Sequence, residues 1–260
     1  MFPLRDENPQ ILTPFITYGL IVANLYAWFS LQGMGRGDAF LGSLCTYGLI
    51  PGELFGLVEP GTLIPLDGFS VCRLEGQARP ETIFTSMFMH GSWFHLIGNL
   101  WFLFLFGNNI EDAMGHFRFL IFYLLTGFVA AAAQIVAAPT SVMPMVGASG
   151  AISGVMGAYI LLYPRVRVVM LVIIVIFITT IRVPAAIVLG YWFMLQLLGG
   201  LFIPSDGGGV AFFAHAGGFL AGMFLVRHFK NPKLLAMHPY YAGIDLDQGS
   251  DVRRHRRRGR

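Results

Sequence analysis

Charged residues are scarce in this sequence. Only 12% of its 260 residues are Asp, Glu, Lys or Arg, against roughly a quarter in an ordinary soluble domain. Hydrophobic residues make up 55% of the chain, and apolar runs approaching the ~20 residues that cross a bilayer as a helix recur along it. This composition argues against a soluble domain and indicates an integral membrane protein.

Cysteine is also scarce, and the familiar metal-binding spacings are missing. The chain has two cysteines, Cys45 and Cys72, and neither C-x-x-C nor H-E-x-x-H occurs. We therefore predict no metal site and no cofactor. An oxidising compartment would permit a disulfide between the two cysteines. Two free thiols agree equally well with the sequence, because spacing alone fixes no geometry.

Six apolar segments are predicted to cross the membrane as helices. The first lacks the basic start and the cleavage site of a secretory signal, so it is interpreted as a retained span. The fourth is short, and its hydropathy alone also fits a buried helix of a soluble protein. A further run, 168–178, is rich in β-branched residues and favours a hairpin at the membrane interface over a seventh helix. The six predicted spans are 11–31, 93–107, 117–138, 149–163, 184–202 and 210–226.

Charge placement predicts the orientation of these spans. Six spans bring both termini to one side, and short loops rich in Lys and Arg face the cytoplasm. Arg118, Arg165 and Arg167 fall on the side of the termini. We expect short amphipathic pieces in the long outer connection, 32–85. The predicted parts of the chain are a short cytoplasmic N-terminus (1–10), a six-helix domain (11–229) and a cytoplasmic tail (230–260).

The basic character of the chain resides in its tail. The net charge is +3, yet the last eight residues contain six arginines, which leaves −3 for the remainder. A nucleic-acid-binding tail is one interpretation of this run. Beside a membrane span, an anchor attracted to anionic lipid is the simpler one. Membrane lipid, and no nucleic acid, is therefore the expected partner.

Polar groups inside membrane spans are costly, so they are candidates for function. Ser149 opens the fourth span within the sequence from Gly147 to Gly150. A serine at a helix start lies near free backbone N–H groups, which can stabilise an oxyanion, and the flanking glycines let a substrate backbone approach. Ser149 could instead be a helix N-cap, and G-x-S-G alone is a weak signal.

A histidine in the last span provides a possible base. His215 has Gly218 and Gly222 on a nearby helical face, and the fourth span carries its own row of small residues. Packing these two faces together would bring His215 within reach of Ser149, which is the arrangement of an activated serine nucleophile. A lone intramembrane histidine could equally be a structural hydrogen bonder or part of a proton path.

Two further polar candidates lie in the second span. His95 and Asn99 are spaced i, i+4 and share one helical face. Their donors could complete an oxyanion hole with the backbone N–H of Ser149, or they could simply bond between helices. His90, five residues before His95, is a candidate partner of this pair.

Taken together, these motifs resemble those of bacterial rhomboid proteases across roughly residues 85–227. The three motifs follow in the family's order: H-x-x-x-N at His95 and Asn99, G-x-S-G at 147–150, and A-H-x-x-G-x-x-x-G at 214–222. The resemblance implies an all-α membrane protein, a rhomboid-like bundle of six transmembrane helices with a long outer loop between helices 1 and 2. It also implies a bacterial inner membrane, in which the charge placement predicts that both termini are cytoplasmic.

The resemblance also implies roles for the candidate residues. Ser149 is the expected nucleophile and His215 the expected base. Glu111 and Gly115 are expected to stabilise the fold. The sequence departs from the family at Ser153, where some members carry an aromatic residue that stacks on the histidine, and it lacks a Trp-Arg pair in the outer connection. The expected oxyanion and supporting residues are His95, Asn99 and Gly147, and the expected outer shell around the site is His90 and Gln134.

The sequence therefore predicts an intramembrane serine endopeptidase that uses a Ser149–His215 dyad. Its expected partners are transmembrane protein substrates, cleaved near the outer membrane face. The glycine-rich segment 203–209 is interpreted as a lid over His215, with a flexible turn as the alternative. The rival functions are a catalytically inactive rhomboid-like protein that binds membrane clients, and a transporter. The intact serine and histidine argue against the first, and the lack of inverted repeats argues against the second.

Overall fold

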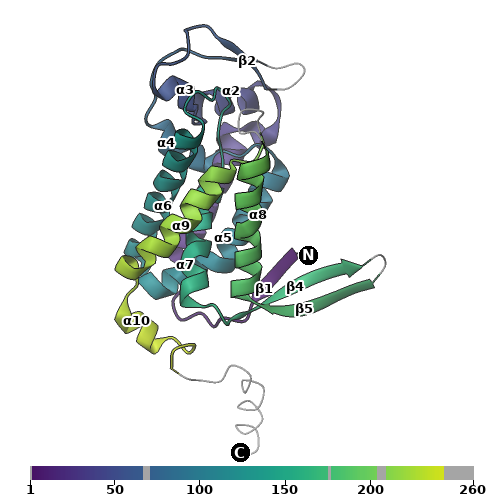
Figure 1. Ribbon diagram of the computed structural model, residues 1–260, viewed down its shortest axis with the longest axis vertical. Helices are drawn as coiled ribbons and strands as arrows, with labels where there is room; N and C mark the ends of the chain where they lie inside the picture. Colours follow the sequence, from purple (N-terminus) through teal and green to yellow (C-terminus); the bar gives the residue numbers. More distant parts are fainter. Residues whose placement is uncertain (1, 67–70, 175–176, 204–208, 243–260) are drawn as a thin grey trace, which may run out of the picture.

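The computed structural model describes residues 2–66, 71–174, 177–203 and 209–242. Long helices dominate these residues, and α6 to α9 run along the long axis of the molecule (Figure 1). Each of the six apolar segments predicted from the sequence forms a helix. They are α1 (Phe15–Tyr26), which continues as the π-helical turn η1 (Ala27–Leu31), α5 (Trp93–Met114), α6 (His116–Ala137), α7 (Ser149–Leu162), α8 (Ala185–Phe202) and α9 (Phe212–Phe229).

Two of the described helices, α6 and α8, are long and apolar enough to cross a membrane by length and composition. The segment Phe15–Leu31 and helix α7 are apolar but shorter. Large hydrophobic side chains remain exposed on many helices, including Val22, Val136 and Tyr191, as expected where lipid is the solvent. The other four crossings of the six-span interpretation remain a prediction.

Helix α7 forms the centre of the bundle, and every residue from Gly150 to Tyr159 is buried. Its backbone lies directly against that of α9. A Cβ atom at Gly222 would lie 1.9 Å from the carbonyl oxygen of Gly154, and one at Gly218 would lie 2.1 Å from that of Gly150. Any side chain larger than hydrogen would push the two helices apart, so the predicted packing of small-residue faces is confirmed.

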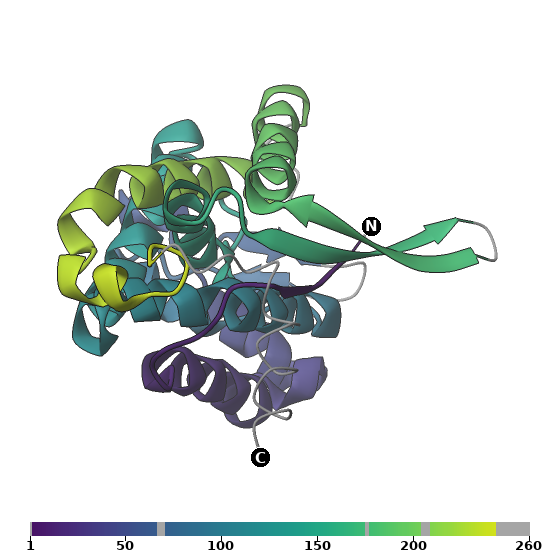
Figure 2. The ribbon, with the colours of Figure 1, turned by 90° about the horizontal axis from the view of Figure 1, so that it is seen from below.

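The structure differs from the predicted all-α fold class, because it contains a three-stranded antiparallel sheet. The predicted hairpin is present as β4 (Arg167–Ile174) and β5 (Phe177–Pro184), and β1 (Phe2–Asp6) pairs with the other edge of β4. The hairpin projects away from the helices (Figure 2). The β-branched residues of 168–178 explain the hairpin, and the free edge of β4 explains why the N-terminal residues join it as a strand.

Acidic side chains hold the N-terminal segment on the bundle. Asp6 accepts hydrogen bonds from the Tyr159 hydroxyl at 2.5 Å and from the Asn109 amide at 3.0 Å. The Glu111 carboxylate accepts from the backbone N–H and the hydroxyl of Thr17, at 2.8 and 2.7 Å. Glu111 thus satisfies free N–H groups in the first turn of α1, which agrees with the stabilising role expected for it. Gly115, the other residue of that expectation, has a φ of +80° at the turn between α5 and α6.

The outer connection is a folded cap that is built from short helices and strands. A small core of Ile50, Val58, Ile64, Cys72 and Leu74 lies inside it. Its elements are a 3₁₀ turn η2 (Gly33–Gly35), α2 (Gly37–Tyr47), α3 (Pro51–Leu54), β2 (Leu63–Pro65), β3 (Val71–Arg73), α4 (Thr82–Thr85) and a second 3₁₀ turn η3 (Ser86–Phe88). A short helix α10 (Pro232–Met237) follows the bundle at the opposite end.

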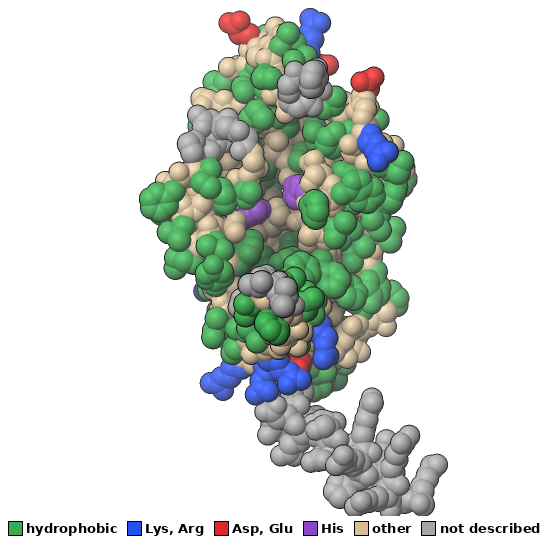
Figure 3. Space-filling model, turned by 90° about the vertical axis from the view of Figure 1, so that its right-hand side faces the viewer, with side chains coloured by type: hydrophobic (Ala, Val, Ile, Leu, Met, Phe, Trp, Pro, Cys, Tyr) green, Lys and Arg blue, Asp and Glu red, His purple; other side chains and the backbone are tan. Residues whose placement is uncertain are grey.

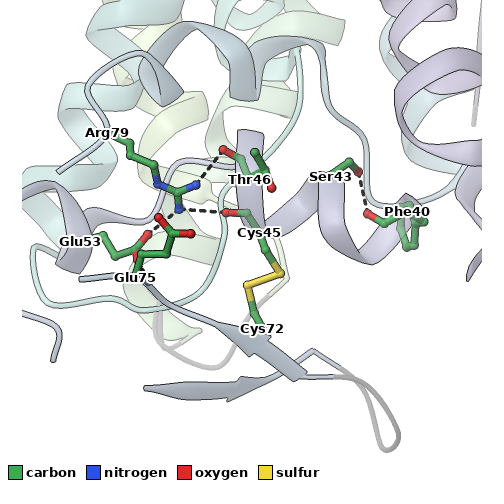
Figure 4. The surroundings of a disulfide bond; sticks show 8 residues. All are labelled: Phe40, Ser43, Cys45, Thr46, Glu53, Cys72, Glu75 and Arg79. Carbon is green, nitrogen blue, oxygen red and sulfur yellow. Dashed lines mark hydrogen bonds and ion pairs between the residues drawn. A yellow bond between two sulfur atoms is a disulfide. The ribbon is translucent and has the colours of Figure 1, made fainter. Parts of the chain in front are cut away.

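A disulfide and an ion pair tie the cap together (Figure 4). Cys45 of α2 is bonded to Cys72 of β3, which decides between the two states that the sequence left open. Arg79 pairs with the buried carboxylate of Glu53 at 2.6 Å and donates to the carbonyl oxygens of Cys45 and Thr46. A charge-assisted network around a cross-link gives this cap a fixed shape.

Candidate active site

Ser149 is the first residue of α7, and the loop before it is fixed to the cap. Leu49 and Met145 exchange two backbone hydrogen bonds, of 2.9 and 2.8 Å, and Gly147 N–H donates to the carbonyl of Ser86 at 2.9 Å. The helix N-cap is Ala148, so the interpretation of Ser149 as an N-cap is wrong. Its hydroxyl is therefore available for another partner.

That partner is His215 of α9. The Nε2 atom of His215 lies 2.7 Å from the Oγ atom of Ser149. The close packing of α7 on α9 explains the contact, because Ser149 precedes Gly150 and His215 lies one turn before Gly218, and these two glycines touch. Two residues far apart in the chain are thus brought into hydrogen-bond distance by backbone packing.

His95 and Asn99 of α5 line the same cavity as Ser149 and His215. This cavity has a volume of about 720 Å³. Figure 3 shows histidine side chains within a hollow of the molecular surface, between hydrophobic walls. Among the residues that line the cavity, as far as the structure describes the chain, none carries a formal charge other than through histidine.

The two α5 side chains differ in their hydrogen bonds. The Asn99 amide nitrogen is buried and has no partner among the described residues. The Nδ1 atom of His95 accepts from Gly91 N–H at 3.3 Å, so in a neutral ring the hydrogen is on Nε2. A Cβ atom at Gly147 would lie 2.6 Å from that Nε2. Both α5 residues therefore have donors in reach of the cavity, and Gly147, with φ of +126°, cannot be replaced without displacing His95.

Gln134 and His90 were expected to surround the catalytic residues. Gln134 lines the cavity, whereas His90 lies next to His95 and outside the cavity lining. Gln134 lines the cavity, and its side-chain oxygen accepts from Ala214 N–H at 3.3 Å, next to His215. His90 is fully buried, does not line the cavity, and has its ring 5.2 Å from that of His95.

Two residues of α8 that were not predicted from the sequence as site residues contact His215. The Trp192 ring lies 5.7 Å from the imidazole with a tilt of 40°. Gln196 places its Oε1 atom 2.8 Å from Nδ1 of His215. Ser153 hydrogen-bonds the carbonyl of Ser149 instead, so Trp192 provides the ring contact that Ser153 cannot. A glutamine inside an apolar span was the signal that could have identified Gln196.

Two further expectations concern the surroundings of the site. Residues 204–208 of the expected lid lie outside the described residues, while Gly209 and Val210 line the cavity. No group of three or more His, Cys, Asp or Glu side chains that could hold a metal occurs within the described ranges. The described polar lining of the cavity includes Ser149, His95 and His215, and the amides of Asn99 and Gln134.

Comparison with known proteins identifies one family that matches more than half of the chain. Residues 77–231, which include all the side chains that surround the cavity on α5, α7, α8 and α9, match the sequence model of the Rhomboid domain. A stretch of 77 residues is 38% identical to Rhomboid-like protein 11, chloroplastic, from Arabidopsis thaliana. That match covers 30% of this chain and 27% of the plant protein.

Proposed function

This chain is a membrane protein of the rhomboid family, and from that premise we propose that it is an intramembrane serine endopeptidase. The observation that carries the proposal is the 2.7 Å contact between Ser149 Oγ and His215 Nε2 inside a cavity of about 720 Å³. A serine paired with a neutral imidazole is an activated nucleophile. The substrates would be other transmembrane proteins.

The proposed reaction begins with attack of Ser149 Oγ on a peptide carbonyl carbon while His215 Nε2 takes the hydroxyl proton. The negative charge that develops on the carbonyl oxygen would be met by the Asn99 amide, the Nε2–H of His95 and the backbone N–H of Ser149. The C–N bond then breaks as His215 returns the proton to the leaving amine. Water, activated by His215, hydrolyses the ester to Ser149 and releases the second product.

The cavity suits both the water and the substrate that this reaction needs. Its polar lining, which includes Gln134 and Asn99, can hold water among apolar walls. Peptide bonds in a helix are shielded by their own hydrogen bonds. A substrate helix with glycine near its outer end should unwind at lower cost than one with strong helix formers, and would therefore be preferred.

Covalent labelling tests the proposed function directly. Purified wild-type protein should react with a fluorophosphonate probe, and mass spectrometry of the digested protein should locate the adduct on Ser149. Label on another serine, or no label on folded protein by several such probes, would contradict the assignment. Boiled protein serves as the control for non-specific labelling.

We further propose that the cap faces the outside of a bacterial inner membrane and that both termini are cytoplasmic. The Cys45–Cys72 disulfide fits an oxidising compartment. Lys and Arg side chains gather at the end of the molecule opposite the cap (Figure 3). Arg165 precedes β4, Arg167 is its first residue, and positive charge favours the cytoplasmic side. In this orientation Ser149, the first residue of α7, would lie toward the outer face of the membrane.

Reporter fusions check this orientation. Alkaline phosphatase, which needs an oxidising compartment, should be active when inserted at Gly56 and inactive when fused after Phe117 or Arg165. A cytoplasmic fluorescent reporter should give the opposite pattern at the same three positions. Phosphatase activity at Arg165 without activity at Gly56 would invert the orientation.

A further inference from the structure

The imidazole of His215 has hydrogen-bond partners on both ring nitrogens. Nε2 lies 2.7 Å from Ser149 Oγ, and Nδ1 lies 2.8 Å from Oε1 of Gln196. The Gln196 side chain is 9% exposed and comes from α8, a helix that contributes no other polar group to the imidazole. Three residues from three helices therefore form one continuous chain of hydrogen bonds.

The amide of Gln196 selects one tautomer of His215. Its nitrogen lies 3.5 Å from the backbone carbonyl oxygen of Trp192, one turn earlier on α8, and only the nitrogen can donate to a carbonyl. Oε1 must then face Nδ1 as an acceptor, so Nδ1 carries the hydrogen. Nε2 is left with its lone pair directed at the Ser149 hydroxyl, and this is the tautomer that can accept the serine proton.

A neutral amide suits this position better than the carboxylate of a soluble serine protease. No charged side chain among the described residues lines the cavity, and an ionised carboxylate buried in apolar surroundings is costly unless it is paired. Glutamine offers the same acceptor without a net charge. Trp192 lies four residues before Gln196 on the same face of α8 and restricts the imidazole plane from the side.

We propose that Gln196 is a positioning residue that fixes the tautomer and the ring orientation of His215, forming a Ser149–His215–Gln196 chain. This inference rests on the proposed function for its catalytic meaning, although the orientation of the imidazole can be measured without any activity. Gln196 is not among the residues that line the cavity, so its proposed effect is exerted through His215.

Substitution by methionine tests the role of the acceptor. Gln196→Met keeps the length and helix propensity of the side chain but removes the amide oxygen. With Nδ1–H left buried and unpaired, we expect kcat to fall roughly 10- to 100-fold with KM nearly unchanged. Gln196→Glu restores an oxygen acceptor and should recover part of the loss. Leu195→Met places the same side chain one position earlier, on the exposed side of α8, and is the matched control.

The second readout is the ¹⁵N spectrum of histidine-labelled protein, with His215→Ala used to assign the signals. The wild-type spectrum should show a protonated Nδ1 and an unprotonated Nε2 at His215, and Gln196→Met should shift this ring towards a mixture of tautomers. An unchanged tautomer together with an unchanged kcat overturns the inference. A wild-type protein that shows the expected tautomer but no labelling of Ser149 would overturn the proposed function and leave the positioning role standing.

Discussion

Removal of either reacting side chain is expected to reduce proteolysis to background. Ser149→Ala removes the nucleophile. His215→Ala removes the base within 2.7 Å of it, and a serine without a base is a poor nucleophile at neutral pH. Loss of such a residue in a soluble serine protease lowers kcat on the order of 10⁶-fold. Cleavage of a transmembrane substrate in reconstituted vesicles would measure the effect.

The double variant makes this test specific for a pair that acts as a unit. Ser149→Ala/His215→Ala should lose no more activity than either single change, because each one already abolishes the same step. His228→Ala, an exposed histidine at the other end of α9, is the matched control. A His215→Ala enzyme that keeps most of its rate would remove the base from the mechanism. If the wild-type protein binds transmembrane proteins but cleaves none of them, the result would favour the inactive, client-binding alternative.

The helices and the serine–histidine contact can be predicted from residue patterns that each lie within one segment of the sequence. Each apolar run is long enough to predict a helix, and the small residues at Gly150 and Gly154 mark a face that another backbone can approach. The matching row at Gly218 and Gly222 identifies the partner. These two rows predict that the helices pack together, because a close approach of two helices requires small residues on both.

The features that the sequence did not reveal depend on the rotation of helices or on distant pairing. Strand β1 pairs with Val168 and its neighbours, more than 160 positions away, and residues 2–6 contain no alternating apolar pattern of their own. Gln196 could face lipid, α7 or α9, and only the docked position of α8 directs it to His215. The disulfide likewise needed the cap to bring Cys45 and Cys72 within bonding distance.

Replacement of Asn99 by alanine is expected to slow the chemical step while leaving substrate binding intact. The Asn99 amide nitrogen is buried at the cavity without a partner among the described residues, and a buried donor left unpaired is costly in the resting protein. Negative charge on the carbonyl oxygen would supply the missing acceptor. Loss of one such donor costs about 10² to 10³ in kcat in a soluble protease.

The separate changes in kcat and in KM distinguish an oxyanion-stabilising role from a substrate-binding one. A donor that strengthens its bond only as charge develops lowers kcat and leaves KM nearly constant, whereas a substrate-binding residue raises KM. The remaining donors, His95 Nε2–H and Ser149 N–H, should keep Asn99→Ala well above the background of Ser149→Ala. Ile97→Ala, exposed on the same helix, controls for the loss of side-chain volume. If Asn99→Ala has the wild-type kcat and a lower melting temperature, its amide bonds only within the protein, and the oxyanion must be held by the other two donors alone.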